Sequence, residues 1–380
     1  MAASFSLEGP VWTAAGGGPA RTGLFPARVD LKAKPARTLP TRGAVQAAAV
    51  FDASGRVFVA DMAGTVRSFD ADGAPRWERA LEGAVSATPA VDPDNGRLFV
   101  ATHTGRVRAL AAVDGAVHWQ RDLPTASDPR IVGDLLYLPR SRRLVVSSWG
   151  GRFHALEADS GRTVAEWDAG LNPSAGAAAD ARETVFCLRV TPGSGVTLVQ
   201  RTAAGQETVL HREPEGPRGA GRTPVTAAPV VDGARGRVWF VANDGRGAVL
   251  LVWALAEGRL AARWPFPCGV QAPPALAPDG AAWVADLAGS VHRCDPARPE
   301  PRVRYDSGAE YLLAAPVSDA SGRCWVGDPL RRLHRIEPGG QGQVVFEAGR
   351  GFQAAPSFDP AGNLYLPGTD RRVYVFLNRT

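Results

Sequence analysis

The residues best suited to bind a ligand stand at the head of short strands that recur along the chain. When the Ala/Pro-rich stretches are aligned on their Pro and Asp residues, one position is an amide or a hydroxyl in most copies: Gln46, Ser86, Ser174, Thr226, Gln271 and Gln353. The other copies carry Ala126 and Leu313 there. Amides and hydroxyls donate and accept hydrogen bonds without a charge. Two interpretations stay open: a water-filled channel mouth, and a pocket for a small polar ligand or a peptide.

A second polar series stands in the turns that follow the next strand of each copy. Most of its members are aspartates, and the series is Asp61, His103, Trp149, Asp244, Asp286, Asp328 and Asp370. Carboxylates beside a pocket could do acid–base work, whereas an aspartate in a turn commonly caps its own backbone. Trp149 breaks the series. It is either packed against a neighbour or exposed as an anchor, since tryptophan is enriched at interface hot spots.

Other chemistry-bearing residues are scattered. The sequence has no G-x-S-x-G, H-E-x-x-H or P-loop motif. Three of the six histidines recur at equivalent strand positions instead of converging: His154, His292 and His334. The four cysteines are neither adjacent nor spaced C-x-x-C, and they are Cys187, Cys268, Cys294 and Cys324. We therefore expect reduced thiols and no metal site.

The elements that must position these residues form a repeat of about 40 residues. Its clearest copies are residues 55–77 and 96–119, in which aromatic and β-branched runs alternate with Gly, Asp and Asn turns, as is typical of strands. One aromatic or β-branched residue near the centre of each second strand marks the copy, and we call it the landmark. The landmarks are Phe58, Phe99, Val145, Phe186, Trp239, Trp283, Trp325 and Tyr365. Eight such copies predict an all-β protein, an eight-bladed β-propeller of four-stranded antiparallel blades.

The end of the chain predicts how the ring closes. After Tyr365 the sequence holds one more strand and then stops, so the eighth copy lacks its outer strand. The extended segment at about 33–43 is the candidate for that strand, which would remove the open sheet edges. We therefore expect residues 33–380 to form a single propeller domain and residues 1–32 to form a lead-in that crosses its surface.

Composition excludes several partners. The net charge is +5, but only two of the basic residues are lysines and the arginines are scattered, so no basic stripe for nucleic acid is present. No apolar run approaches the ~20 residues that span a bilayer. The first residues, MAASFSLEGP, lack the basic and apolar regions of a signal peptide. We expect a cytoplasmic monomer without membrane insertion, or a periplasmic one if the natural chain begins further upstream.

Tryptophans at the end of several copies carry a family resemblance. G-x-x-x-W occurs at 73–77 and 115–119, with looser versions at 161–167 and 258–264, and residues 10–23 read PVWTAAGGGPARTG. These phrases resemble the tryptophan-docking motif and the start of the pyrroloquinoline-quinone-type propellers, which include quinoprotein dehydrogenases and an outer-membrane-assembly lipoprotein. The resemblance implies that these rings pack between blades, namely Trp77, Trp119, Trp167 and Trp264. Other blades carry smaller or different groups near that position and should have softer joints: Leu210, Tyr305, Phe346 and Leu39.

A quinone cofactor is not expected. A dehydrogenase of this family would carry an adjacent cysteine pair over the quinone and hold Ca²⁺ with Glu, Asn and Asp, and the sequence has neither the pair nor a Glu on a predicted inner strand. The leading hypothesis is a non-catalytic scaffold that docks a protein or peptide partner on its channel-mouth face. The alternative is an enzyme of unusual type with a polar pocket at that mouth, for example in a biosynthetic pathway. A third hypothesis is a scaffold subunit of a multiprotein assembly.

Overall fold

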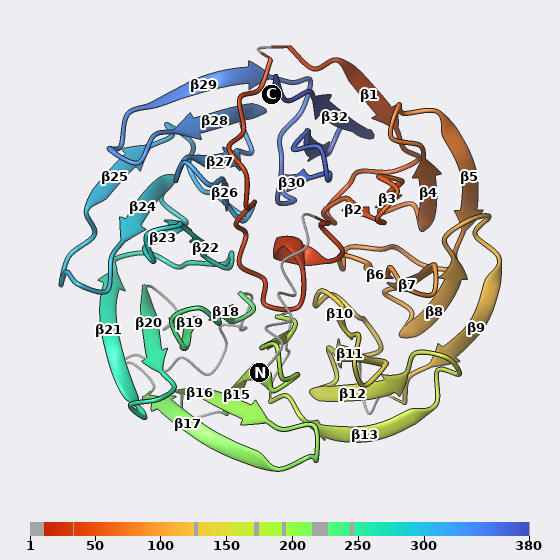
Figure 1. The fold of residues 1–380 in the computed structure, drawn as a ribbon, viewed down its shortest axis with the longest axis horizontal. Coiled ribbons are helices and arrows are strands. Elements are labelled where there is room, and N and C mark those ends of the chain that lie inside the picture. The colour runs from red at the N-terminus through yellow and green to blue at the C-terminus, as the bar shows by residue number, and fades with distance from the viewer. Residues whose placement is uncertain are drawn as a thin grey trace, which may run out of the picture.

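Eight four-stranded antiparallel sheets stand in a ring around a central axis (Figure 1). The computed structural model describes residues 11–32, 34–124, 128–170, 175–191, 195–214, 227–243 and 247–379. Within these ranges the single helical element is the short 3₁₀ turn η1 (Ala15–Gly17). The predicted all-β, eight-bladed propeller is confirmed.

Each blade is a meander that runs outward from the axis. The innermost strands are short, and they are β2 (Val50–Phe51), β6 (Ala90–Asp92), β10 (Leu136–Leu138), β14 (Ala178–Ala179), β18 (Val230–Asp232), β22 (Ala275–Leu276), β26 (Val317–Ser318) and β30 (Ser357–Phe358). The second strands are β3 (Val57–Ala60), β7 (Arg97–Ala101), β11 (Arg143–Ser148), β15 (Val185–Thr191), β19 (Arg237–Asn243), β23 (Ala282–Ala285), β27 (Cys324–Gly327) and β31 (Leu364–Gly368).

The third strand of each blade is mostly buried, and the outermost strand is the most exposed. The third strands are β4 (Thr65–Phe69), β8 (Arg106–Ala111), β12 (Arg152–Glu157), β16 (Gly195–Arg201), β20 (Ala248–Ala254), β24 (Ser290–Cys294), β28 (Arg332–Ile336) and β32 (Arg372–Phe376). The outer strands are β5 (Pro75–Ala80), β9 (Val117–Asp122), β13 (Thr163–Asp168), β17 (Glu207–Glu213), β21 (Arg259–Phe266), β25 (Val303–Asp306), β29 (Gly342–Glu347) and β1 (Arg37–Pro40).

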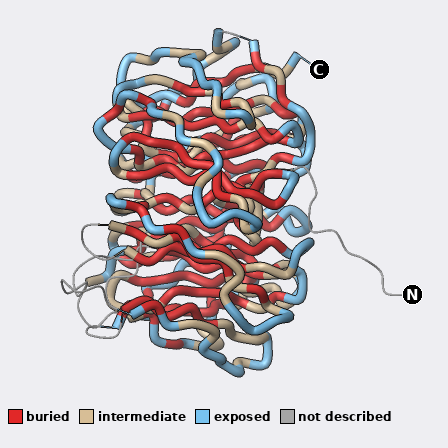
Figure 2. Tube along the Cα trace, turned by 90° about the vertical axis from the view of Figure 1, so that its left-hand side faces the viewer, coloured by how far each residue is buried: buried red, intermediate tan, exposed pale blue. Residues whose placement is uncertain are grey.

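The core consists of apolar layers between neighbouring blades. All eight landmark residues lie on second strands, where they are at most 3% exposed. β-Branched and aromatic residues suit these strands because both faces of a blade are covered by the next blade. Figure 2 shows the buried residues running through the height of the ring, with exposed residues at the turns and the outer rim.

The N-terminal strand β1 completes the last blade, as the sequence predicts. β1 pairs antiparallel with β32, and Thr38 lies opposite Tyr374. The backbone amide of Ala36 extends the ladder by donating to the carbonyl of Val375 at 2.8 Å. Closure by one strand from the far end of the chain leaves blade 8 with the same four strands as the others.

The lead-in does not cross the outer surface, which corrects the expectation for residues 11–32. Trp12, Phe25 and Val29 are 3%, 2% and 0% exposed, and all three belong to a core cluster with residues of blades 1, 7 and 8. In Figure 1 this segment runs through the centre of the ring. The physical reason is that its apolar side chains and its carbonyl groups both find partners at the ends of the inner strands. Residues 1–10 lie outside the described residues.

Backbone hydrogen bonds attach the lead-in to one inner strand after another. Amides of the inner strands donate to its carbonyls at 2.7 to 2.9 Å, in the pairs Phe51 to Trp12, Val91 to Thr13, Ala179 to Pro19, Val231 to Ala20, Leu276 to Thr22 and Ser318 to Gly23. Each of these amides lies at the end of its inner strand that is farther from the strand-head positions, such as Gln46 and Ser86. The lead-in therefore closes the channel from that side and leaves the other side open.

Candidate functional site

The polar positions at the strand heads converge on a cup at the open end of the channel. Its volume is about 200 Å³, and Gln46, Ser86, Gln271, Leu313 and Gln353 all line it. We call it the mouth cup. Two further predicted members, Ser174 and Thr226, lie outside the described residues.

Val132 lines the mouth cup in blade 3, where the alignment placed Ala126. Ala126 lies outside the described residues. The spacing to the second-strand landmark identifies the correct residue, because the strand head precedes it by 12 or 13 residues in other blades (46 to 58 and 86 to 99) and Val132 precedes Val145 by 13. Alignment on proline failed because blade 3 carries a longer connection before its inner strand.

The rim of the mouth cup is joined by hydrogen bonds between side chains. Gln46 Nε2 donates to Gln353 Oε1 at 2.9 Å, which connects blade 1 to blade 8. Ser86 Oγ lies 2.7 Å from His103 Nε2, so this member of the turn series supports a member of the strand-head series. Burial lowers the pKa of His103, the nearby Arg130 lowers it further, and Asp128 opposes this shift, so the neutral imidazole is favoured.

Arg21 and the glycines of the lead-in form the floor. The Arg21 side chain is 2% exposed, and it donates from Nε to the carbonyl of Ala177 at 2.6 Å and from Nη2 to that of Asp134 at 2.9 Å. Its Nη1 is buried, has no hydrogen-bond partner among the described residues, and lies 3.7 Å from Asp134 Oδ2. Burial lowers the pKa of Arg21, and Asp134 opposes this shift. Gly16 is required here, because its φ is 66° and a Cβ would lie 2.8 Å from the Arg21 backbone.

The turn aspartates that the structure describes, namely Asp61, Asp286, Asp328 and Asp370, are not among the residues that line the mouth cup. Asp61, Asp286 and Asp328 are 1%, 2% and 0% exposed. Asp61 accepts hydrogen bonds from the backbone amides of Arg42 and Gly43 at 2.9 and 3.0 Å, as well as from its own turn. These carboxylates therefore hold turns and neighbouring blades together, which is the structural alternative considered for them.

Two of these aspartates hold buried histidines that the sequence had left unexplained. His292 Nε2 lies 2.7 Å from Asp286 Oδ2, and His334 Nε2 lies 2.9 Å from Asp328 Oδ2. Burial raises the pKa of both aspartates, but hydrogen bonds from the histidines and from backbone amides outweigh it and hold both pKa values below the ordinary one. The repeated six-residue Asp-to-His interval was the signal in the sequence.

Trp149 is half-buried beside the mouth and is paired with a cation. The guanidinium of Arg130 lies 5.0 Å from the centre of its ring, and Arg130 also pairs with Asp128. At the corresponding turn of blade 8, Asp370 accepts a hydrogen bond from the hydroxyl of Tyr374. Asp244 lies outside the described residues.

The described residues contain no group of three His, Cys, Asp or Glu side chains that could hold a metal ion. All four cysteines are free. No helix in the described part of the chain is long and apolar enough to cross a membrane.

The predicted joint tryptophans lie between blades. The indole nitrogens of Trp77, Trp119 and Trp264 donate to carbonyls of the next blade at 3.0, 2.8 and 3.1 Å. Trp167 stacks on Phe153 with centroids 5.3 Å apart. Fold and site together define an eight-bladed propeller with tryptophan-docked blades and a channel that is open at one end.

The chain belongs to the family described as outer membrane protein assembly factor BamB, whose model matches residues 10–185 and, in an overlapping match, residues 93–300. This confirms the resemblance to the quinone-type propellers. No curated protein matches the chain in sequence.

Solved structures show the same fold at low identity. BamB from Moraxella catarrhalis is 19% identical, with a TM-score of 0.71, over 92% of this chain and 98% of its own. The quinohemoprotein alcohol dehydrogenase from Comamonas testosteroni is 15% identical, with a TM-score of 0.77, over 97% of this chain and 80% of its own. The computationally designed Ika8 protein is 14% identical, with a TM-score of 0.67, over 90% of this chain and 99% of its own. At these identities the likeness concerns the fold alone.

Proposed function

We propose that the chain is a non-catalytic propeller scaffold that docks a protein or peptide partner at its channel mouth. The observation that carries the proposal is the mouth cup, which has an uncharged amide and hydroxyl rim above the buried donor Arg21 Nη1. Asp134 lies 3.7 Å from this donor, too far for a hydrogen bond, so a ligand that brings an acceptor is favoured. A backbone carbonyl or a chain-terminal carboxylate of a partner segment has that chemistry.

Family membership supports the same class of function, since the matched family is named for an assembly factor. The alternative enzyme would use Asp61, Asp286 or Asp328 beside the rim glutamines. Those carboxylates are at most 2% exposed and already bonded, so nothing in the cup favours the alternative.

Site-specific photo-crosslinking in the producing cells tests the proposal. A benzoylphenylalanine at Gln271, on the rim, is expected to give one discrete adduct with a second protein. The same group at Val117, an exposed residue of β9, is the matched control and is expected to give none. Equal labelling at both positions, or robust turnover of a small molecule by the purified protein, would contradict the proposal.

We further propose that the chain works as a monomer without a quinone, in the cytoplasm or, if the natural chain is longer at its N-terminus, in the periplasm. The absence of adjacent cysteines in the sequence supports the first part. An absorption spectrum of protein purified from its natural cells, together with light scattering, tests cofactor and mass. A quinone absorption band would overturn the proposal that no quinone is bound, and the mass of a dimer would overturn the proposal of a monomer.

A further inference from the structure

Four exposed arginines form a row along the mouth face of blades 7, 8 and 1, and we call it the arginine row. Its members are Arg331 in the β27–β28 turn, Arg350 in the connection to β30, Arg371 in the β31–β32 turn and Arg42 after β1. The amide of the first residue donates to the carbonyl of the second in the pairs Ala348 to Arg331, Thr369 to Gly351 and Thr41 to Arg371, at 2.8, 3.1 and 3.0 Å. The four side chains therefore come from segments that lie side by side.

Two members of the arginine row have no ionic partner. Arg331 pairs with Glu347 at 2.8 Å, and Arg42 pairs with a glutamate of β5 at 3.0 Å. Arg350 and Arg371 make no ion pair within the described part of the chain. The row therefore keeps two exposed guanidinium groups that are available to a ligand.

The carboxylates of the mouth face do not neutralise these two arginines. Asp370 stands in the row, but its Oδ2 accepts a hydrogen bond from the hydroxyl of Tyr374 and its Oδ1 is buried. Across the mouth, in blade 2, Glu82 and Asp122 both pair with Arg106. Carboxylates there already have their arginine, whereas the arginine row has cations in excess.

The positions of Arg331 and Arg371 are unusual for a residue with a side chain. Both follow their landmark by six residues, and their φ angles are 72° and 65°. Glycine takes this place in four other blades, where a Cβ would lie 1.9 to 2.9 Å from a carbonyl oxygen of the next connection, namely at Gly64, Gly105, Gly151 and Gly289. The left-handed region disfavours a side chain, and such exceptions cluster at functional sites. Blades 7 and 8 thus present a charged side chain where these four blades have none.

Exposed apolar side chains adjoin the arginine row in blade 7. Leu330 directly precedes Arg331 and is 48% exposed, and Tyr311, in the connection to β26, is 37% exposed. Tyrosine and arginine are enriched in protein interfaces, whereas binding to nucleic acid calls for a longer stripe of cations. A protein segment is therefore the favoured occupant.

The arginine row borders the mouth cup. Gln353 follows Arg350 by three residues, and Gln46 follows Arg42 by four. Both glutamines line the cup, and they are hydrogen-bonded to each other. A segment that reaches the cup over blade 8 therefore passes over the arginine row.

We propose that the partner at the mouth docks with an acidic segment, whose carboxylates pair with Arg350 and Arg371. The guanidinium group suits this role because its planar fork binds a carboxylate through two hydrogen bonds. The inference rests on the proposed function, since it names the chemistry of the partner at the same site.

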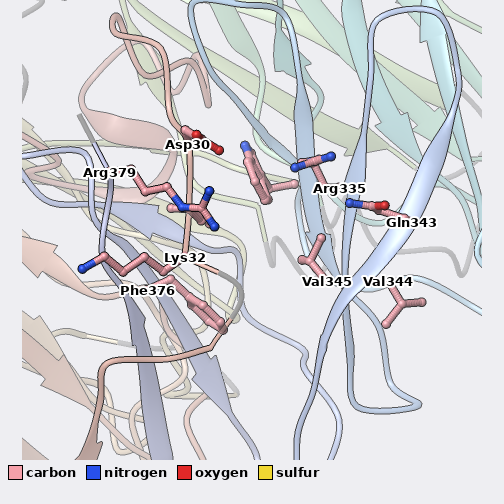
Figure 3. Close-up of a pocket in the computed structure, with 10 residues that line it drawn as sticks. Asp30, Lys32, Arg335, Gln343, Val344, Val345, Phe376 and Arg379 are labelled. Atoms are coloured by element: carbon pink, nitrogen blue, oxygen red, sulfur yellow. The ribbon is translucent and has the colours of Figure 1, made fainter.

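Two further unpaired cations, on the opposite face of the ring, supply a matched control. Lys32 and Arg379 line a cavity of about 320 Å³ together with Asp30 (Figure 3). Residues near the start of β29 line this cavity, whereas Arg350 follows the end of that strand. Lys32 and Arg379 are exposed and make no ion pair among the described residues. The variant K32Q/R379Q therefore removes as much charge as R350Q/R371Q and leaves the mouth unchanged.

Fluorescence anisotropy with the peptide fluorescein-Gly-Glu-Asp-Leu-Glu-Asp-amide measures binding by the purified full-length protein. Wild type is expected to bind saturably, and added salt is expected to weaken the binding. R350Q/R371Q is expected to bind at least about fivefold more weakly, with a smaller salt dependence. K32Q/R379Q is expected to bind as wild type does. Both variants alter exposed residues without ion pairs, so the Tm of each is expected to match that of wild type.

Three results of this titration would contradict the proposal. No saturable binding by wild type, or equal binding by wild type and R350Q/R371Q, would overturn the site. Equal weakening in K32Q/R379Q would assign the effect to net charge and overturn it as well. Tighter binding of a single-stranded DNA of the same charge would overturn the assignment to an acidic protein segment.

Crosslinking in cells separates this inference from the proposed function. If both hold, the Gln271 adduct forms in wild type and its yield falls several-fold in R350Q/R371Q. An undiminished adduct in R350Q/R371Q would overturn the role of the arginine row and leave the mouth as a docking site. Absence of the adduct in wild type would contradict the proposed function, while the anisotropy titration would still decide whether the row binds acidic peptides.

Discussion

The side chain of Gln46 donates a hydrogen bond from Nε2 to Oε1 of Gln353, at 2.9 Å and across 307 residues of sequence. The bond connects the heads of the first and last blades at the rim of the mouth cup. It is exposed to solvent, and exposed neutral bonds of this kind add at most about 1 kcal/mol to stability. These glutamines are therefore free to exchange the bond for one to a ligand.

The double variant Q46A/Q353A is expected to keep its stability and lose partner docking. Urea unfolding should change by less than about 1 kcal/mol, because no buried group loses a partner. The yield of the Gln271 crosslink should fall several-fold. Gln120→Ala, on the exposed face of β9, is the matched control and should change neither measurement; a normal crosslink yield in Q46A/Q353A would count against a role for the rim.

Arg21→Ala is expected to destabilise the whole ring. The change leaves the carbonyls of Asp134, Leu135 and Ala177 without their donor at the base of the channel. Buried groups that lose a charged partner cost about 2–5 kcal/mol, which is measurable by urea unfolding. Arg28→Ala, an exposed residue of the same lead-in, should cost less than about 0.5 kcal/mol. Equal effects of the two would mean that the Arg21 contacts do not hold the lead-in.

Acid should weaken the fold through Asp286 and Asp328. Their pKa values lie below the ordinary 3.8 in the folded protein. A carboxylate of this kind stabilises fully above its unfolded pKa, and the contribution is lost as pH falls through the lower folded pKa. Asp328→Asn should therefore lower the free energy of unfolding by about 3–5 kcal/mol at pH 7. The difference in free energy of unfolding between the variant and wild type should become smaller below pH 4.

Stability measured from pH 7 to pH 3 tests this expectation. Glu300→Gln removes an exposed carboxylate that has no ion pair in the described residues, so it should follow wild type at every pH. A gap between Asp328→Asn and wild type that stays constant over this range would show that the carboxylate's ionisation is not the source.

Trp264→Ala should destabilise the protein more than Trp77→Ala. Trp264 is fully buried and stacked on Trp239, while Trp77 is half-buried in its joint. Replacing a buried tryptophan by alanine costs about 3–5 kcal/mol, and partial exposure reduces this. Urea midpoints with unchanged slopes measure the difference, and the reverse order would contradict the packing described for these joints.

One thiol should react quickly with Ellman's reagent in the native protein. Cys187, Cys294 and Cys324 are buried, and burial raises the pKa of each thiol, to about 12 for Cys187. Cys268 is partly exposed, and burial together with Asp286 raises its pKa to a smaller extent. Since the thiolate is the reactive species, Cys268→Ser should abolish the fast phase and Cys294→Ser should leave it intact. Two or more fast thiols would contradict the burial.

Most of the fold can be predicted from the repeat, because the residues that form the strands and turns of each blade are close together in sequence. Strand order, landmarks and closure by β1 follow from such local signals, as does the convergence of Gln46, Gln271 and Gln353. The path of the lead-in does not, because Trp12 and Phe25 find their partners in blades at the far end of the chain. Their apolar character predicts that they are buried, but it does not predict which blades they pack against.

The lead-in also sets an order of assembly. The amide of Val29 donates to Asp319 Oδ2 across 290 residues, and Leu31 bridges to Asn378 near the other end of the chain. Contacts of such long range form slowly, and during synthesis the N-terminal segment emerges first. Residues 11–32 are made before the blades that they contact and must wait until the last blades exist, so the order of synthesis and the order of completion run in opposite directions.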